Sequence, residues 1–245
     1  MPNDSPSQRK ATTLAATGSS IAIAFNVTIE SATGSALSDV LIGNDAANSL
    51  DGGSGDDTLD GGGDADTAVY SSNRATYTIV RTAPGYSVSG AEGSDTLTGV
   101  ERIRFSDEQL AFDLDRDEAA GNTVRIIGAA FDAPTIKQHP DYVGIGLELF
   151  DGGMSMEAVC GLVLATSLYL SLAGSAGNEA FVNLVFSNVM GMAPSAVECD
   201  FYVGMLQGSG GTLTQAELLE IAANTPANEI NINLVGLQQS GVEFV

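Results

Sequence analysis

The sequence predicts a multidomain α+β protein: a short parallel β-roll with a β-sandwich-like cap, followed by an all-α helical domain. Three successive patterns predict this class, namely nine-residue units, then alternating apolar positions, then apolar positions at helical spacing. In chain order we expect a flexible tail (1–20), the roll (21–69), the cap (70–118), the helical domain (119–232) and a separate C-terminal segment (233–245).

The tail begins with a polar stretch that carries Pro2 and Pro6. It contains no basic cluster followed by an apolar segment and a small-residue cleavage site, which a secretory leader would need. We therefore expect a flexible segment there.

The roll is predicted by four nine-residue units that follow one another without a gap. The third unit matches the pattern G-G-x-G-x-D-x-U-x at every position, where U is a large apolar residue, and the other units keep its register. This pattern is typical of a calcium-loaded parallel β-helix. Glycines at the first, second and fourth positions allow backbone angles that other residues disfavour. A flexible Gly/Asp-rich linker, the alternative, has no reason to keep an apolar residue at each U position. The units are Gly34–Ile42, Gly43–Asp51, Gly52–Asp60 and Gly61–Val69, and their U positions are Leu41, Leu50, Leu59 and Ala68.

The sixth position of each unit predicts metal ligands. Two units make one coil, so each residue lies over the residue 18 positions later, about 4.8 Å away. Asp39 then lies over Asp57, and Asn48 over Asp66, with Glu30 of the preceding segment Phe25–Thr33 beneath Asn48. Stacked carboxylates repel unless a cation lies between them, and carboxylate and carbonyl oxygens are the ligands of Ca²⁺. The candidate ligand residues are Glu30, Asp39, Asn48, Asp57, Asp66, Gly34, Gly43, Gly52, Gly53, Gly55 and Gly61.

The overall charge limits the partners and suggests a compartment. The chain has 31 acidic and 9 basic residues and a net charge of −22, so nucleic acid and anionic lipid are poor partners. Without calcium the carboxylates repel and we expect the roll to be unfolded. Extracellular modules bind Ca²⁺ at about 10⁻⁴–10⁻³ M, well above the free calcium of the cytosol. The roll should therefore fold only outside the cell.

Neither a membrane span nor a disulfide framework is predicted. Ala158–Asn178 is the longest uncharged run. Because it includes several glycines and serines, it has fewer than the roughly 20 apolar residues that a membrane span needs. We expect a buried core helix there. Cys160 and Cys199 both fall in apolar helical patterns, which favours buried free thiols over a bridge.

The cap is predicted by short alternating strands, and the helical domain by capped apolar runs. Turns are expected at Pro84-Gly85 and at Ala91–Gly93, and helix caps at Ser155 and at Thr212 or Thr214. The expected strands lie around Tyr77–Ile79, Tyr86–Val88, Leu97 and Ile103–Phe105. The expected helices are Thr123–Phe131, Tyr142–Phe150, Met156–Leu170, Glu179–Met190, Ala196–Leu206, Thr214–Ala223 and Asn228–Leu234.

Two further patterns leave alternatives open. Tyr142–Ser155 (YVGIGLELFDGGMS) parallels Tyr202–Thr214 (YVGMLQGSGGTLT), which indicates an internal duplication or merely a shared helix-loop composition. Asp113, Asp115 and Asp117 follow the D-x-D-x-D opening of an EF-hand, but Glu118 and Val124 replace its glycine and its final glutamate. An acidic interdomain linker is the other interpretation.

The repeats and the segment after them resemble the repeats-in-toxin (RTX) region that ends serralysin-type secreted metalloproteases. The resemblance covers about 90 residues from Ile29. Ala119–Ile232 more weakly resembles an uncharacterised helical repeat domain, often fused behind such repeats in secreted and surface-layer proteins of Gram-negative bacteria. That family usually has Arg-Ala-Pro-Asp and Tyr-Trp. Asp132–Pro134, Met192–Pro194 and Phe201-Tyr202 occupy those positions here. A ligand that the family's residues hold is therefore not expected to bind in the same way. The resemblance implies type I secretion with an uncleaved C-terminal signal in residues 233–245, of which Gly241–Val245 has the expected form; an ordinary frayed terminus is the alternative.

No catalytic motif accompanies the resemblance. The zinc-binding H-E-x-x-H helix and the G-x-S-x-G elbow are absent from the sequence, and His139, the one histidine, lies in a loop beside Pro140. We therefore expect no enzyme. We expect a calcium-dependent extracellular structural protein. It would be exported by the type I secretion machinery and would form a homo-oligomer or adhere at the cell surface. The alternative is a carrier module or accessory subunit for a secreted hydrolase on another chain, and a hydrolase of unrecognised type is a third hypothesis.

Overall fold

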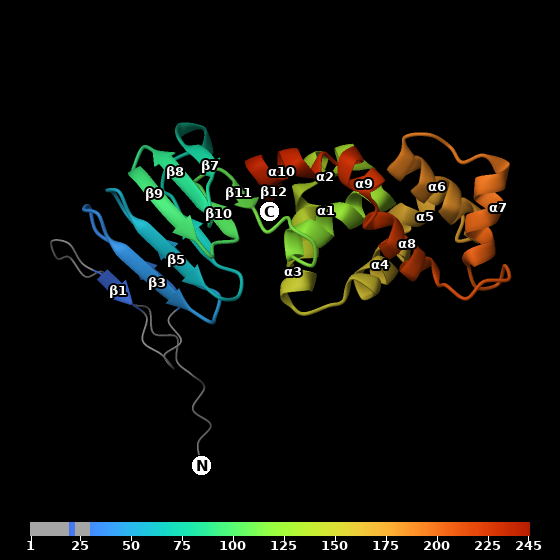
Figure 1. The fold of residues 1–245 in the computed structure, drawn as a ribbon, viewed down its shortest axis with the longest axis horizontal. Coiled ribbons are helices and arrows are strands. Elements are labelled where there is room, and N and C mark those ends of the chain that lie inside the picture. The colour runs from blue at the N-terminus through green and yellow to red at the C-terminus, as the bar shows by residue number, and fades with distance from the viewer. Residues whose placement is uncertain (1–19, 23–29) are drawn as a thin grey trace, which may run out of the picture. The chain divides into compact units, whose positions relative to one another are not determined.

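The computed structural model describes residues 20–22 and 30–245. The chain divides into two compact units, one ending at Ala111 and the other running from Phe112 to Val245, which we call the strand unit and the helical unit (Figure 1). The expected tail up to residue 19 and the expected register of residues 25–29 lie outside the described residues.

The strand unit contains two sheets whose parallel strands alternate along the chain. Strands of one sheet pair with partners two nine-residue units away, as Leu41 with Leu59 and Ser49 with Thr67. The first sheet has the order β1 (Ser20–Ala22), β3 (Val40–Asn44), β5 (Thr58–Gly62), β9 (Gly93–Thr98), β8 (Tyr86–Gly90), β7 (Thr78–Arg81). The second includes, in order, β11 (Gln109–Ala111), β10 (Arg102–Arg104), β6 (Thr67–Val69), β4 (Ser49–Asp51) and β2 (Ser31–Thr33).

The parallel ladder continues past the four repeats. Strand β9 pairs in parallel with β5, Leu97 beside Leu59, and β10 pairs in parallel with β6, Ile103 beside Ala68. A short 3₁₀ helix (Arg74–Thr76) and the antiparallel β7–β8 hairpin intervene. Strands within the segment expected as the cap thus extend the ladder. The side chains that stack between the sheets, all buried, are Leu41, Leu50, Leu59, Ala68, Leu97 and Ile103.

The helical unit is arranged around α1 (Ala119–Ala130), which is buried along almost its whole length. The other elements are α2 (Ala133–Gln138), α3 (Pro140–Asp151), α4 (Met156–Leu164), α5 (Ser167–Ala173), α6 (Asn178–Met190), α7 (Ala196–Met205), α8 (Gln215–Ala223), α9 (Pro226–Asn231), α10 (Leu234–Ser240) and the strand β12 (Val242–Phe244). Apolar side chains of α1, α4, α5, α6 and α8 form a common core. Within the part of the chain that the structure describes, no single helix is long and apolar enough to span a membrane, although α4 and α5 pass that test together as a pair bent by 70°.

Local side-chain chemistry explains both the confirmed and the incorrect boundaries. The side chains of Ser155 and Thr214 cap α4 and α8 as predicted, Thr214 within a capping box. The single helix expected at Met156–Leu170 is wrong: the chain bends at Thr166, whose hydroxyl accepts the N–H of Tyr169 and starts α5. Between the expected helices Thr123–Phe131 and Tyr142–Phe150 the chain forms a further helix, α2, because the proline in its first turn loses no hydrogen bond. Cys160 and Cys199 are free thiols, as predicted, but only Cys160 is buried and Cys199 is partly exposed.

Candidate calcium sites in the strand unit

The sixth-position side chains stack in two columns, one at each set of turns. In the first column Asp57 Oδ1 accepts the backbone N–H of Asp39 at 2.8 Å, and Asp95 Oδ1 accepts that of Asp57 at 2.9 Å. In the second column Asp66 Oδ1 accepts the N–H of Asn48 at 2.7 Å, and Glu101 Oε2 accepts that of Asp66 at 2.9 Å. The predicted stacking of Asp39 on Asp57 and of Asn48 on Asp66 is therefore confirmed.

Each column contains buried oxygen atoms without a hydrogen-bond donor. These are Oδ1 of Asp39, Oδ2 of Asp57 and Oδ2 of Asp66, on side chains that are almost fully buried. A buried carboxylate oxygen without a partner is costly unless a cation neutralises it. The orphaned oxygens therefore mark where a metal ion fits.

Glycines at the first position of the units bring further oxygens close to these carboxylates. A Cβ atom placed on Gly61 would lie 2.0 Å from the carbonyl oxygen of Gly99 and 2.4 Å from Asp66 Oδ2. A Cβ atom on Gly34 would similarly lie 2.3 Å from the carbonyl oxygen of Gly52 and 3.0 Å from Asp39 Oδ2. The space that a side chain would fill is thus lined by carboxylate and carbonyl oxygens, the donor set of Ca²⁺.

Burial makes the charged form of these acids unfavourable in the absence of a cation. Burial, together with the nearby carboxylates of Asp95 and Asp39, raises the pKa of Asp57 to about 6. Burial likewise raises the pKa of Asp66 to about 7, with Glu101 adding to the shift. The pKa of Asp95 is also raised, mainly by burial. A bound divalent cation would reverse these shifts by stabilising the carboxylates.

The remaining predicted ligand residues occupy different environments. Gly53 and Gly55 have φ values of +88° and +125°, which explains the need for glycine at both turn positions. Glu30 lies at the register position below Asn48, because Ser31 pairs with Ser49, but its side chain is exposed. The other predicted glycines, Gly34, Gly43, Gly52 and Gly61, all face a sixth-position side chain.

Sequence reasoning missed two members of the columns, Asp95 and Glu101. A signal for Asp95 was present, because Gly90–Thr98 reads GAEGSDTLT and departs from the repeat pattern only at its second position. The β7–β8 hairpin separates this unit from Val69 and breaks the nine-residue phase. Glu101 does not stand at the sixth position of a complete nine-residue unit, so the sequence contains no comparable signal for it.

The acidic segment Asp113–Asp117 is held by protein groups. Asp113 Oδ2 accepts the N–H of Ala120 at 3.1 Å and so caps the start of α1. The carbonyl oxygen of Asp115 accepts a hydrogen bond from the buried guanidinium of Arg125 at 3.2 Å. Over residues 20–22 and 30–245, no three Asp, Glu, His or Cys side chains gather into a metal cluster. A metal site in either column would therefore have to use backbone oxygens as well as side chains, whereas Asp113–Asp117 lies just before α1 and hydrogen-bonds to it.

Comparison with known families agrees with this geometry. Residues 33–68 match the family of the RTX calcium-binding nonapeptide repeat, in four copies. No curated protein matches the chain. Nonapeptide repeats of this type bind Ca²⁺ and are typical of secreted proteins, so Ca²⁺ is the ion of the strand unit. Asp95 and Glu101 lie beyond the matched residues.

Proposed function

We propose that this chain is a calcium-dependent, non-enzymatic extracellular structural protein that folds on Ca²⁺ binding after type I secretion. In this proposal the strand unit is a parallel β-roll and the helical unit provides the contacts for self-assembly or adhesion at the cell surface. The observation that carries the proposal is the pair of buried carboxylate columns with orphaned oxygens at Asp39, Asp57 and Asp66.

The columns support a folding switch because they destabilise the fold without calcium and stabilise it when calcium is bound. Without the ion, buried carboxylates stack with raised pKa values, so ionisation at neutral pH opposes folding. With the ion, the oxygens of Asp57 and Asp95, or of Asp66 and Glu101, become ligands together with glycine carbonyl groups. Because Ca²⁺ then binds the folded unit and not the unfolded chain, its binding energy stabilises the fold.

The helical unit supports a role in protein contacts. Its described residues expose many large apolar side chains, among them Val197, Phe201 and Ile230. Exposed apolar surface of this kind is typical of proteins that bind other proteins. The sequence contains neither H-E-x-x-H nor G-x-S-x-G, which favours a structural role over hydrolysis.

Circular dichroism across a calcium titration tests the switch, and electron microscopy tests assembly. We expect the strand signal to appear as Ca²⁺ rises toward millimolar concentration, and ordered assemblies to form with calcium and disappear with chelator. A strand signal that is unchanged in chelator would disprove the switch. Monodisperse monomers in both conditions would disprove self-assembly, and constant co-purification with a secreted hydrolase would favour an accessory subunit instead.

A further inference from the structure

The helical unit contains two copies of one helical pattern. Helices α1, α4 and α5 of the first copy correspond to α6, α8 and α9 of the second, in the same order along the chain. The connecting segments align without a gap: Ala133–Gly144 reads APTIKQHPDYVG and Ala193–Gly204 reads APSAVECDFYVG. Pro140 ends α2 and starts α3 in the first copy, whereas the second continues through Asp200 as the single helix α7. Gly144 and Gly204 therefore occupy equivalent positions.

In the first copy the C-terminal segment of the chain covers this position. The N–H of Val245 donates to the carbonyl oxygen of Pro140 at 3.3 Å. A Cβ atom placed on Gly144 would lie 2.0 Å from the carbonyl oxygen of Val245. The glycine is thus required for a peptide segment to lie directly on the helix.

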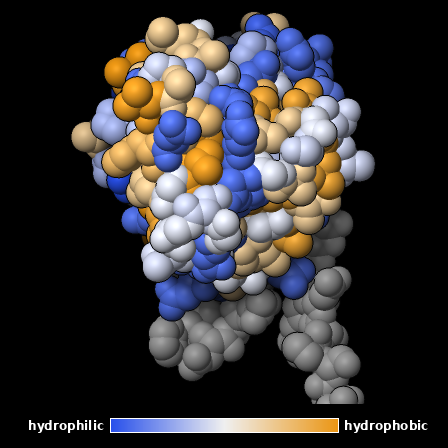
Figure 2. Space-filling view, turned by 90° about the vertical axis from the view of Figure 1, so that its right-hand side faces the viewer, coloured by the Kyte–Doolittle hydropathy of each residue, from blue (hydrophilic) through white to orange (hydrophobic). Residues whose placement is uncertain are grey.

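In the second copy the equivalent surface is open. A Cβ atom on Gly204 would meet no atom within 4 Å, and α7 has no buried residue. Val197 lies about two turns and Phe201 about one turn before Gly204, and their side chains are 79% and 64% exposed. They replace the charged Lys137 and Asp141 of the first copy. Figure 1 shows α7 at the end of the helical unit, and Figure 2 shows apolar patches between polar ones on that end.

The negative charge around this surface indicates which kind of partner segment it would bind. Lys137 is the last lysine or arginine of the chain, so α7 and the elements around it contain acids without basic side chains. Glu198 and Asp200 lie on α7 itself. The C-terminal segment of a second copy of this chain carries Glu243, which these acids would repel, whereas a cationic segment would be attracted.

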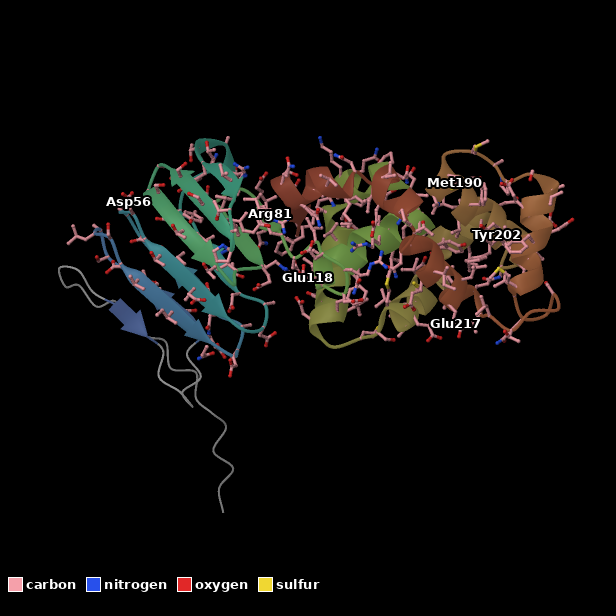
Figure 3. All side chains as sticks on the ribbon, in the orientation of Figure 1. Asp56, Arg81, Glu118, Met190, Tyr202 and Glu217 are labelled. Atoms are coloured by element: carbon pink, nitrogen blue, oxygen red, sulfur yellow. The ribbon has the colours of Figure 1, made fainter. Side chains whose placement is uncertain are left out.

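We propose that the α7 face, formed by Val197, Phe201 and Gly204, binds an extended apolar segment of a partner protein that carries Lys or Arg. The two apolar side chains contact the segment, Gly204 allows its backbone to approach, and Glu198 and Asp200 attract its cation. Tyr202 lies between the face and α6: its ring is 5.2 Å from that of Phe201 and 6.0 Å from that of Phe186 on α6 (Figure 3). The proposal rests on the proposed adhesive role of the helical unit.

Two peptides based on the segment that covers α3 test the proposal. One has the sequence of Ser240–Val245, SGVEFV, and the other replaces the glutamate by lysine, SGVKFV. Fluorescence anisotropy of the labelled peptides with the full chain in calcium gives both affinities. We expect the lysine peptide to bind about tenfold more tightly, with an affinity that falls as salt increases.

Gly204→Leu and Gly161→Leu form a matched pair of variants. Both glycines lie in helices and have open space where a Cβ atom would stand, and leucine is a better helix former than glycine, so both variants should fold. Gly204→Leu fills the α7 face and should reduce binding of the lysine peptide at least about tenfold. Gly161→Leu should leave it unchanged.

Equal binding of the two peptides, or equal binding by the two variants, would overturn the proposal. Calcium-dependent self-association that Gly204→Leu abolishes would overturn it in favour of a second copy, and Phe201-dependent binding to neutral lipid vesicles would overturn it in favour of a membrane. In each case, an intact calcium response in circular dichroism would show that the proposed folding switch still stands.

Discussion

At the scale of single residues, Gly61 is required by the oxygen atoms around it. Its φ is not positive, so backbone strain does not explain the glycine. A Cβ atom on Gly61 would instead enter the space between Asp66 Oδ2 and the Gly99 carbonyl oxygen. Gly63, two residues later, would place its Cβ atom at ordinary contact distance from Asp45, 3.6 Å or more.

We expect Gly61→Ala to destabilise the calcium-loaded strand unit by about 1–3 kcal/mol, because the methyl group overpacks a site filled with oxygens. Gly63→Ala should change its stability by less than about 0.5 kcal/mol. Thermal unfolding at fixed calcium, followed by the strand signal, gives both values. Equal effects of the two substitutions would contradict the oxygen-lined site.

Asp57 allows the charge of a ligand to be tested separately from its shape. Asparagine at this position retains an oxygen that can accept the N–H of Asp39, but it removes the negative charge. We expect Asp57→Asn to lower calcium affinity about tenfold or more, since affinity follows the number of charged ligands. The metal-free protein should be no less stable than the parent. Isothermal calorimetry with Ca²⁺ measures the affinity, with the exposed Asp141→Asn as the control, and an unchanged affinity would exclude Asp57 as a ligand.

At the scale of elements, the stacked turns should give the strand unit opposite responses to pH with and without calcium. Burial raises the pKa of Asp57 to about 6 and of Asp66 to about 7, above the ordinary value near 4. Groups with raised pKa values stabilise the fold below the unfolded value and lose that contribution as pH rises through the folded value. In chelator the strand unit should therefore regain more of its strand signal at about pH 5 than at about pH 8.

With saturating calcium the trend should reverse, because protons and Ca²⁺ compete for the same carboxylates. Circular dichroism at both pH values, on metal-stripped and on calcium-loaded protein, measures the strand signal in the two states. Asp57→Asn should reduce the pH dependence of the metal-free strand signal. A metal-free strand signal that grows between about pH 5 and about pH 8 would contradict the assignment of the buried acids.

Elements with a local signal could be predicted from the sequence, and those that depend on distant contacts could not. The nine-residue phase predicted the stacking of Asp39 on Asp57, since period and register are local properties. Asp95 escaped prediction because the inserted β7–β8 hairpin separates it in sequence from its partner Asp57. In the helical unit, the caps at Ser155 and Thr214 were predictable, whereas the bend at Thr166 was not, because the apolar pattern continues through it.

At the scale of the whole molecule, the two units depend on different interactions. The strand unit concentrates buried acids that need a cation, including Asp39, Asp57 and Asp66. The helical unit has a continuous apolar core, and its buried Arg125 pairs with Glu229 at 3.3 Å. We therefore expect calcium to act on the strand unit only.

We expect chelator to abolish the strand signal and to leave the helix signal in place. Calorimetry should show two transitions, of which only one moves to higher temperature as calcium increases, because only the strand unit binds the ion in its folded form. Glu229→Gln provides the control: it removes the charge that pairs with buried Arg125 and should lower the calcium-independent transition without changing the calcium midpoint. Loss of the helix signal at the same calcium concentration as the strand signal would show that the helical unit cannot remain folded without the strand unit.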